Sequence, residues 1–100
     1  ETSVWRYKPG KGEQGAQIDL LIDRQDRCIN VCEMKFSAAE FEISKSYAKE
    51  MENKLRVFRA NTKTPKTLFL TLVTTYGVKN ARSYAGLVQN EITMSALFKA

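Results

Sequence analysis

Three side chains in the first third of the chain could together cleave a phosphodiester bond. Asp19 lies within one apolar run, and Glu33 and Lys35 stand two positions apart within the next. Two carboxylates can bind Mg²⁺ or Mn²⁺, which take their remaining oxygen ligands from water and substrate phosphate. A nearby lysine can stabilise charge on a phosphate or help to deprotonate an attacking water. The spacing alone equally fits a solvated sheet face on which Lys35 neutralises the two acids.

The sequence also predicts the elements that must position these residues. Strands are expected over 17–23, 28–36, 67–75 and 86–92, with a loop over 8–15, a helix that begins after Ser44 or Ser46, and a final helical turn over 94–98. The helix is indicated by apolar residues that recur every three or four positions: Tyr47, Met51, Leu55 and Phe58. The first two strands form a hairpin, and a helical crossover makes the third strand parallel to the second. The predicted fold class is therefore α/β, a mixed β-sheet with flanking helices.

The hairpin register decides whether the two acids can meet. Residues directly opposite each other in an antiparallel pair share a face of the sheet. A three-residue loop, 25–27, places Asp19 opposite Glu33. The reverse face is then apolar and is expected to pack on the helix, with the residues Ile18, Leu20, Cys32 and Met34. Because opposed carboxylates repel each other, a bound cation would stabilise this arrangement.

The composition is typical of a soluble globular domain. Hydrophobic residues make up 43% and charged residues 27% of the 100 residues. No stretch is apolar enough to span a bilayer and no signal-peptide pattern opens the chain, so the predicted location is cytoplasmic, with no membrane partner. The net charge of +5 favours an anionic partner such as nucleic acid. Cys28 and Cys32 lie too far apart along one strand to form a disulfide with each other.

The residues around the acids resemble those of a known nuclease superfamily. Residues 15–23 are Gly-Ala-Gln-Ile-Asp-Leu-Leu-Ile-Asp, and residues 29–37 are Ile-Asn-Val-Cys-Glu-Met-Lys-Phe-Ser. A strand with an aspartate followed by a strand with Glu-x-Lys is similar to the PD-(D/E)XK nucleases. Within that superfamily, the chain most resembles the nuclease-like domain at the carboxyl end of certain prokaryotic AAA-type ATPases. The terminal Met-Ser-Ala-Leu-Phe also resembles the way such domains finish.

The resemblance implies a restriction-endonuclease-like fold that lacks the first helix of the family core. It implies a metal-dependent nuclease that acts on DNA, with RNA as an alternative substrate. Asp19 and Glu33 would then be metal ligands together with the Met34 carbonyl, Lys35 would be the catalytic lysine, and Mg²⁺ or Mn²⁺ would be the cofactor. Residues 1–100 would be one domain of a longer protein that contains an ATPase module, and a homodimer is a further expected association.

The alternative function is a catalytically inactive module for nucleic-acid binding or protein assembly. Related nucleases usually carry a further acid before the first strand, where this chain has only Glu1 and Glu13. Gln17 also stands where many relatives carry a glutamate, and an amide is a weaker metal ligand than a carboxylate. These differences favour a domain that keeps the fold without cleaving.

Basic residues of the predicted helix form a candidate nucleic-acid-binding stripe. Its members lie along one side of the helix: Lys45, Lys49, Arg56, Arg59 and Lys63. Such a stripe can neutralise phosphates without selecting a base sequence. It equally fits a solvated helix face with Glu50 and Glu52 as partners. Near the amino end, Trp5 and Tyr7 are expected either to stack on bases or to anchor their segment to the core.

Overall fold

The computed structural model describes residues 2–7 and 16–94, which form a β-sheet, an α-helix and a short 3₁₀ helix. In chain order the elements are β1 (Thr2–Tyr7), β2 (Ala16–Asp23), β3 (Cys28–Lys35), α1 (Lys45–Thr62), β4 (Thr67–Thr74), η1 (Ala81–Tyr84) and β5 (Asn90–Thr93). The loop predicted over 8–15, and all but the first residue of the helical turn predicted over 94–98, lie outside the described residues. Among the helices of the described ranges, none is long and apolar enough to cross a membrane.

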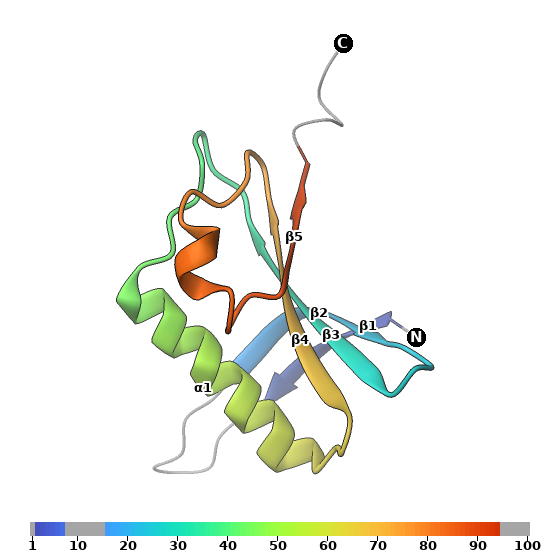
Figure 1. Ribbon diagram of the computed structural model, residues 1–100. Coiled ribbons are helices and arrows are strands. Elements are labelled where there is room, and N and C mark those ends of the chain that lie inside the picture. The colour runs from blue at the N-terminus through green and yellow to red at the C-terminus, as the bar shows by residue number, and fades with distance from the viewer. Residues whose placement is uncertain (1, 8–15, 95–100) are drawn as a thin grey trace.

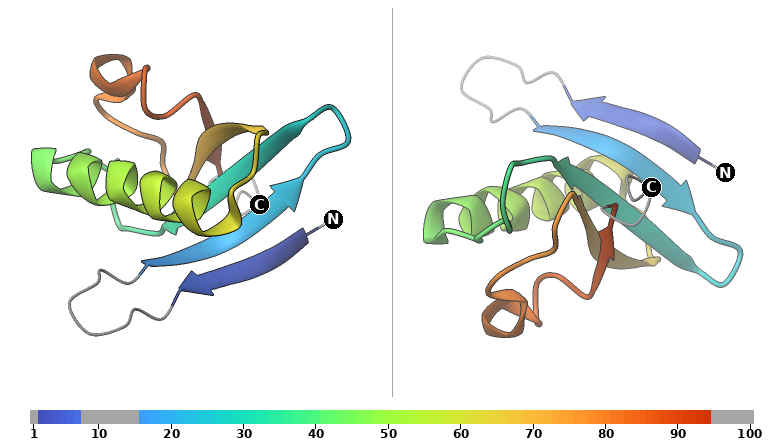
Figure 2. Two further views of the ribbon diagram at one scale, coloured as in Figure 1. Left: turned by 90° about the horizontal axis from the view of Figure 1, so that it is seen from below. Right: turned by 90° about the horizontal axis from the view of Figure 1, so that it is seen from above.

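The strands form a mixed five-stranded sheet in the order β1-β2-β3-β4-β5. β2 runs antiparallel to both β1 and β3, whereas β4 runs parallel to both β3 and β5. Figure 1 shows α1 passing diagonally across the sheet. Both views in Figure 2 place β1 and η1 on opposite sides of α1. The predicted α/β class and the parallel pairing after the helix are therefore confirmed.

β1 forms an edge of the sheet that the sequence pattern does not reveal. Its apolar residues Val4 and Trp5 are adjacent, so the two-residue period of a half-buried strand is missing. The rings of Trp5 and Phe58 meet edge to face, with centroids 5.0 Å apart. Trp5 therefore anchors the amino-terminal segment to α1, which is one of the two roles expected for it.

The strand predicted over 86–92 is wrong in its bounds, because β5 covers only Asn90–Thr93. The apolar residues Leu87 and Val88 lie in a turn, where both of their amides donate to the Tyr84 carbonyl at 2.9 and 2.8 Å. Val88 is nevertheless buried in the core. A short apolar run can thus be buried without forming a strand, and periodicity does not separate the two cases.

Both ends of α1 have clear capping signals. Ser44 is the N-cap, and its hydroxyl oxygen accepts a hydrogen bond from the Tyr47 amide at 3.0 Å. At the other end Lys63 adopts the left-handed conformation, with φ 54°, and donates its N–H to the Arg59 carbonyl. Pro65 follows, which disfavours any continuation of the helix. These caps set the two ends of the helix.

α1 covers one face of the sheet, and the covered face differs from the expected one. The buried residues Val31 of β3 and Leu70 and Leu72 of β4 belong to the core beneath the helix. Side chains alternate across a strand, so Met34 points to the opposite face, where it is 37% exposed. This corrects the expectation that the helix packs on the reverse face for Leu20, Cys32 and Met34, whereas Ile18 does lie in the core with the helix residues. The helix packs instead on the face that carries Val31 of β3 and its neighbour Leu70 of β4. The hairpin alone does not indicate this pairing.

A three-residue turn sets the register of β2 against β3. The Arg24 amide donates to the Cys28 carbonyl at 2.9 Å, which closes the turn. Arg27 takes a left-handed φ of 65°, as the last residue of such a loop commonly does. Leu20 consequently pairs with Cys32. The predicted loop is therefore confirmed, and the predicted register is confirmed over residues 20–23 of β2.

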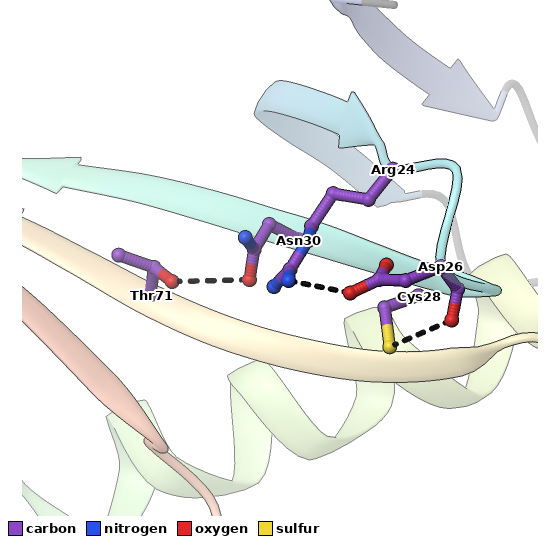
Figure 3. A network of polar contacts seen from close by, with 5 residues as sticks. All are labelled: Arg24, Asp26, Cys28, Asn30 and Thr71. Atoms are coloured by element: carbon purple, nitrogen blue, oxygen red, sulfur yellow. Dashed lines mark hydrogen bonds and ion pairs between the residues drawn. The ribbon is translucent and has the colours of Figure 1, made fainter.

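Polar contacts continue from this turn along the sheet face that α1 does not cover. Arg24 Nη2 and Asp26 Oδ2, at the turn, form an ion pair with a separation of 2.5 Å (Figure 3). The Cys28 thiol lies 3.7 Å from the Asp26 carbonyl oxygen. Further along, the Asn30 and Thr71 side chains are hydrogen-bonded at 3.4 Å. This last contact ties β3 to β4 from the side opposite the helix.

Two loops hold the amino end of α1 against the sheet. The Phe41 amide donates to the Gly77 carbonyl at 2.9 Å, and the Lys79 amide donates to the Phe41 carbonyl at 2.8 Å. The Asn80 side chain bonds both the amide and the carbonyl of Ile43, each at 2.9 Å. The segment between β3 and α1 is therefore fixed to the segment that follows β4.

Candidate functional site

The pairing of β2 with β1 is irregular at Asp19. Between the pairs Ser3–Leu21 and Trp5–Ile18, β1 has one residue and β2 has two, of which Asp19 is the first. An extra residue on one strand is a β-bulge, which re-aims nearby side chains. The bulge explains why Ile18 and Leu21, three positions apart, both lie in the hydrophobic core.

Asp19 and Glu33 meet where the pairing of β2 with β3 ends. Beyond the last backbone pair, Leu20 with Cys32, the strands are joined through side chains. The Asp19 amide donates to Glu33 Oε2 at 3.2 Å, and the Met34 amide donates to Asp19 Oδ2 at 3.0 Å. Each carboxylate is therefore held by a backbone N–H of the neighbouring strand, and the structure brings the two predicted acids together.

A lysine from the helix forms an ion pair with Glu33. Lys54 Nζ lies 2.6 Å from Glu33 Oε1, while Glu33 Oε2 accepts the Asp19 amide. The Glu33 and Lys54 side chains are 3% and 18% exposed, so solvent screens this pair only weakly. Both oxygens of the Glu33 carboxylate thus have protein donors.

Lys35 lies on the same face of β3 as Glu33, because the two residues are two positions apart. Its ammonium nitrogen is 5.1 Å from the centroid of the Tyr47 ring, a cation–π arrangement. The Tyr47 ring also meets the Phe41 ring edge to face, with centroids 5.1 Å apart. The predicted catalytic lysine therefore shares a face of β3 with Glu33, and its ammonium rests on an aromatic ring.

The Tyr47 hydroxyl is buried and has no hydrogen-bond partner among the described residues. Burial, followed by the negative charges of Glu33, Glu50 and Asp19, raises the pKa of Tyr47 well above its ordinary value of 10.0. The phenol consequently stays protonated at neutral pH and is available as a hydrogen-bond donor. Burial first, and Glu33 second, likewise raise the pKa of the Cys32 thiol.

Replacing Tyr47 with phenylalanine is expected to keep or raise the free energy of unfolding, by up to about 1 kcal/mol, because a buried hydroxyl without a partner is costly. The gain should grow above about pH 10. There the unfolded tyrosine loses its proton while the folded one, with its raised pKa, keeps it, so the wild type loses stability as pH rises. Urea denaturation at neutral and alkaline pH measures both effects.

The half-exposed Tyr76 is the matched control. Its change to phenylalanine should alter neither the free energy of unfolding at neutral pH nor its dependence on alkaline pH. A loss of more than about 1 kcal/mol from Tyr47→Phe at neutral pH would show that the hydroxyl makes a stabilising hydrogen bond.

Asp19 and Glu33 offer the oxygen ligands that Mg²⁺ and Mn²⁺ prefer. Across residues 2–7 and 16–94 there is no group of three or more His, Cys, Asp or Glu side chains that could hold a metal ion. Mg²⁺ commonly binds one or two carboxylates and keeps several waters, so two acids satisfy its chemistry. The Met34 carbonyl stays a predicted ligand, and the contact observed for Met34 is its amide on Asp19. The upstream residues Glu1 and Glu13 lie outside the described residues.

The predicted basic stripe lies on the outer side of α1, except for Lys63, which is the C-cap residue after the helix. All of its members are exposed: Lys45, Lys49, Arg56, Arg59 and Lys63. With 3.6 residues per turn, this side is roughly opposite the side that carries Lys54 towards the sheet. Arg59 Nη1 also bonds the carbonyls of Thr64 and Lys66 at 3.0 and 3.1 Å, so it has a structural contact. The stripe and the acids therefore face different directions.

Lys54 is the site residue that sequence reasoning missed. It stands three positions after Met51 and four before Phe58, both of which are buried against the sheet. A lysine within the apolar side of a helix is a signal that it pairs with a buried acid. Tyr47 was placed correctly in the core by periodicity, but its closeness to Lys35 depends on the loop between β3 and α1.

Comparisons with protein-family models, curated proteins and solved structures found no match. Membership of the PD-(D/E)XK superfamily therefore stays a prediction. Within the described residues, the acid pair and its two lysines are the features that bear on chemistry.

Proposed function

We propose that this chain is a metal-dependent nuclease domain, restriction-endonuclease-like in fold, that hydrolyses phosphodiester bonds of DNA and is joined to an ATPase module in a longer protein. The observation that supports this best is the convergence of Asp19 and Glu33, whose carboxylates accept amide hydrogens across the β2–β3 junction. Lys54 from α1 forms an ion pair with Glu33, and Lys35 lies on the same face of β3 as Glu33. Paired carboxylates with adjacent cations suit phosphate chemistry that depends on a divalent ion.

The residues have distinct roles in this proposal. Asp19 and Glu33 hold Mg²⁺ or Mn²⁺, which when bound supplies an activated water and neutralises charge on the phosphate. The backbone amides of Met34 and Asp19 fix one oxygen of each carboxylate, so the ligands are oriented before any cation arrives. Lys35 can leave the Tyr47 ring by rotating its flexible side chain and place its ammonium on a phosphate oxygen.

The test is cleavage of DNA by the intact longer protein in the presence of Mg²⁺ or Mn²⁺. Asp19→Asn and Lys35→Ala should each lower the cleavage rate by at least about 100-fold, since each removes a charge that the reaction needs. Asp23→Asn is the matched control. Asp23 also forms an ion pair, 2.6 Å from Lys66 Nζ, but its side chain is 47% exposed on a different part of β2. This control should cleave at the rate of the wild type.

Cleavage that both site variants retain would refute the assignment of these residues. Absence of cleavage by the intact protein with either metal would favour the binding-module alternative. A parallel series with RNA of the same sequence separates the two candidate substrates, because a shared acid pair does not distinguish them.

The alternative, an inactive module for binding or assembly, is favoured by a second observation. An open pocket of about 510 Å³ lies between α1 and the turn before β5, away from the acid pair. Its walls are apolar, with Leu55, Leu68 and Leu87, and two arginines border it, Arg56 and Arg59. For this alternative, Arg56→Ala should weaken binding of DNA or of a protein partner without affecting any cleavage, measured by fluorescence anisotropy at two salt concentrations.

A further inference from the structure

The pairing of Glu33 with Lys54 bears directly on how a cation could reach the acid pair. Glu33 is almost fully buried, and an unpaired carboxylate in such a place is costly. The Lys54 ammonium, 2.6 Å from Oε1, offsets that cost in the protein without metal. The same ammonium also contacts Glu33 Oε1, an oxygen that a cation bound to both Asp19 and Glu33 would use.

We propose that Lys54 occupies the place of the cation on Glu33 in the metal-free protein and is displaced when Mg²⁺ or Mn²⁺ binds. This inference rests on the proposed function, because it concerns the same acid pair. Lys54 is then a positioning residue that holds the Glu33 carboxylate in place until the metal arrives. It competes with the metal, so it weakens metal binding while stabilising the empty site.

The geometry of the pair makes this exchange feasible. An ammonium and a divalent cation on the same carboxylate oxygen repel each other, so a bound cation favours the departure of the Lys54 ammonium. The lysine side chain has four rotatable carbon–carbon bonds and a compact charge, and it is 18% exposed, so it has a way out to solvent. Glu33 Oε2 keeps the Asp19 amide throughout, which holds the carboxylate in position as its other oxygen changes partner.

The test compares Mn²⁺ binding by the wild-type protein and by Lys54→Met, a change that removes the charge but keeps the length of the side chain. By isothermal titration calorimetry, Lys54→Met should bind Mn²⁺ on the order of tenfold more tightly, because the competing charge is gone. Its melting temperature should be lower than that of the wild type in chelator and should rise more on addition of Mn²⁺. If Lys54→Met is unfolded in chelator, recovery of its circular dichroism signal with Mn²⁺ is the expected result.

Three further variants locate the effect. Lys66→Met removes a lysine that is likewise 2.6 Å from a carboxylate but at the surface, and it should leave Mn²⁺ affinity unchanged. Lys54→Arg keeps the positive charge and should bind Mn²⁺ no more tightly than the wild type. Glu33→Gln should abolish the binding in the Lys54→Met background, since it removes the shared ligand.

The outcomes separate this inference from the proposed function. If the wild type binds Mn²⁺ through Glu33 and Lys54→Met binds it no more tightly, the displacement of Lys54 is refuted while the metal site stands. The displacement of Lys54 is likewise refuted, while the metal site stands, if the wild type binds Mn²⁺ but Lys54→Met stays unfolded in its presence. If neither protein binds Mn²⁺, both the metal site and the exchange are refuted.

Discussion

Replacing Glu33 with leucine is expected to lower the free energy of unfolding by about 3–5 kcal/mol in metal-free buffer. The Lys54 ammonium would lose its partner while remaining 18% exposed, and the Asp19 amide would lose its acceptor. Leucine has a similar volume, so the loss would come from charge and hydrogen bonding rather than from a cavity. Urea denaturation in the presence of a chelator measures it.

A double variant, Glu33→Leu with Lys54→Met, should recover most of that loss, because it replaces both charges by apolar groups of similar size. Lys66→Met, which opens the exposed pair with Asp23, should cost at most about 1 kcal/mol. A double variant as unstable as Glu33→Leu alone would show that the loss has a cause other than the uncompensated charge of Lys54.

Replacing Leu72 with alanine is expected to cost about 2–5 kcal/mol. Leu72 is fully buried, and the parallel register places it beside Glu33 on the face that α1 covers. The change would remove core contacts and open a cavity next to the Glu33–Lys54 pair, with partial collapse setting the value within that range. Thermal and urea denaturation should agree on the loss.

Ile92→Ala is the control for that change. Ile92 lies on β5 and is half exposed, so its truncation should alter stability by no more than about 0.5 kcal/mol. If Leu72→Ala and Ile92→Ala lower the free energy of unfolding equally, the burial of Leu72 does not determine the loss of stability.

The fold could be predicted where local signals were sufficient. The turn at 25–27 fixed the register of the hairpin, and the crossover helix fixed the direction of β4, as the observed pairs show. The face of the sheet that α1 covers could not be predicted from the hairpin, because both faces of the hairpin carry apolar residues. The face on which Leu70 and Leu72 of β4 lie is the one that the helix covers. The bulge beside Asp19 was equally hidden, since it exists only through pairing with β1.

In the candidate site, the meeting of the two carboxylates and the face of Lys35 could be predicted, but the partners of the two lysines could not. Asp19 and Glu33 follow from spacing and register, which are properties of two adjacent strands. Lys54 is 21 positions from Glu33 along the chain, and their ion pair depends on how α1 docks on the sheet. The position of the Lys35 ammonium over Tyr47 likewise depends on the loop that links β3 to α1. Such contacts are tertiary, and no local period encodes them.

The contact of Trp5 with Phe58 makes the docking of the helix visible to fluorescence. Trp5 is the single tryptophan in the 100 residues, and its ring meets a residue in the last turns of α1. Indole emission shifts to longer wavelengths when water replaces an apolar neighbour. Selective excitation of this residue would therefore tell whether a variant at Glu33 or Lys54 merely rearranges its own surroundings or releases the whole helix from the sheet.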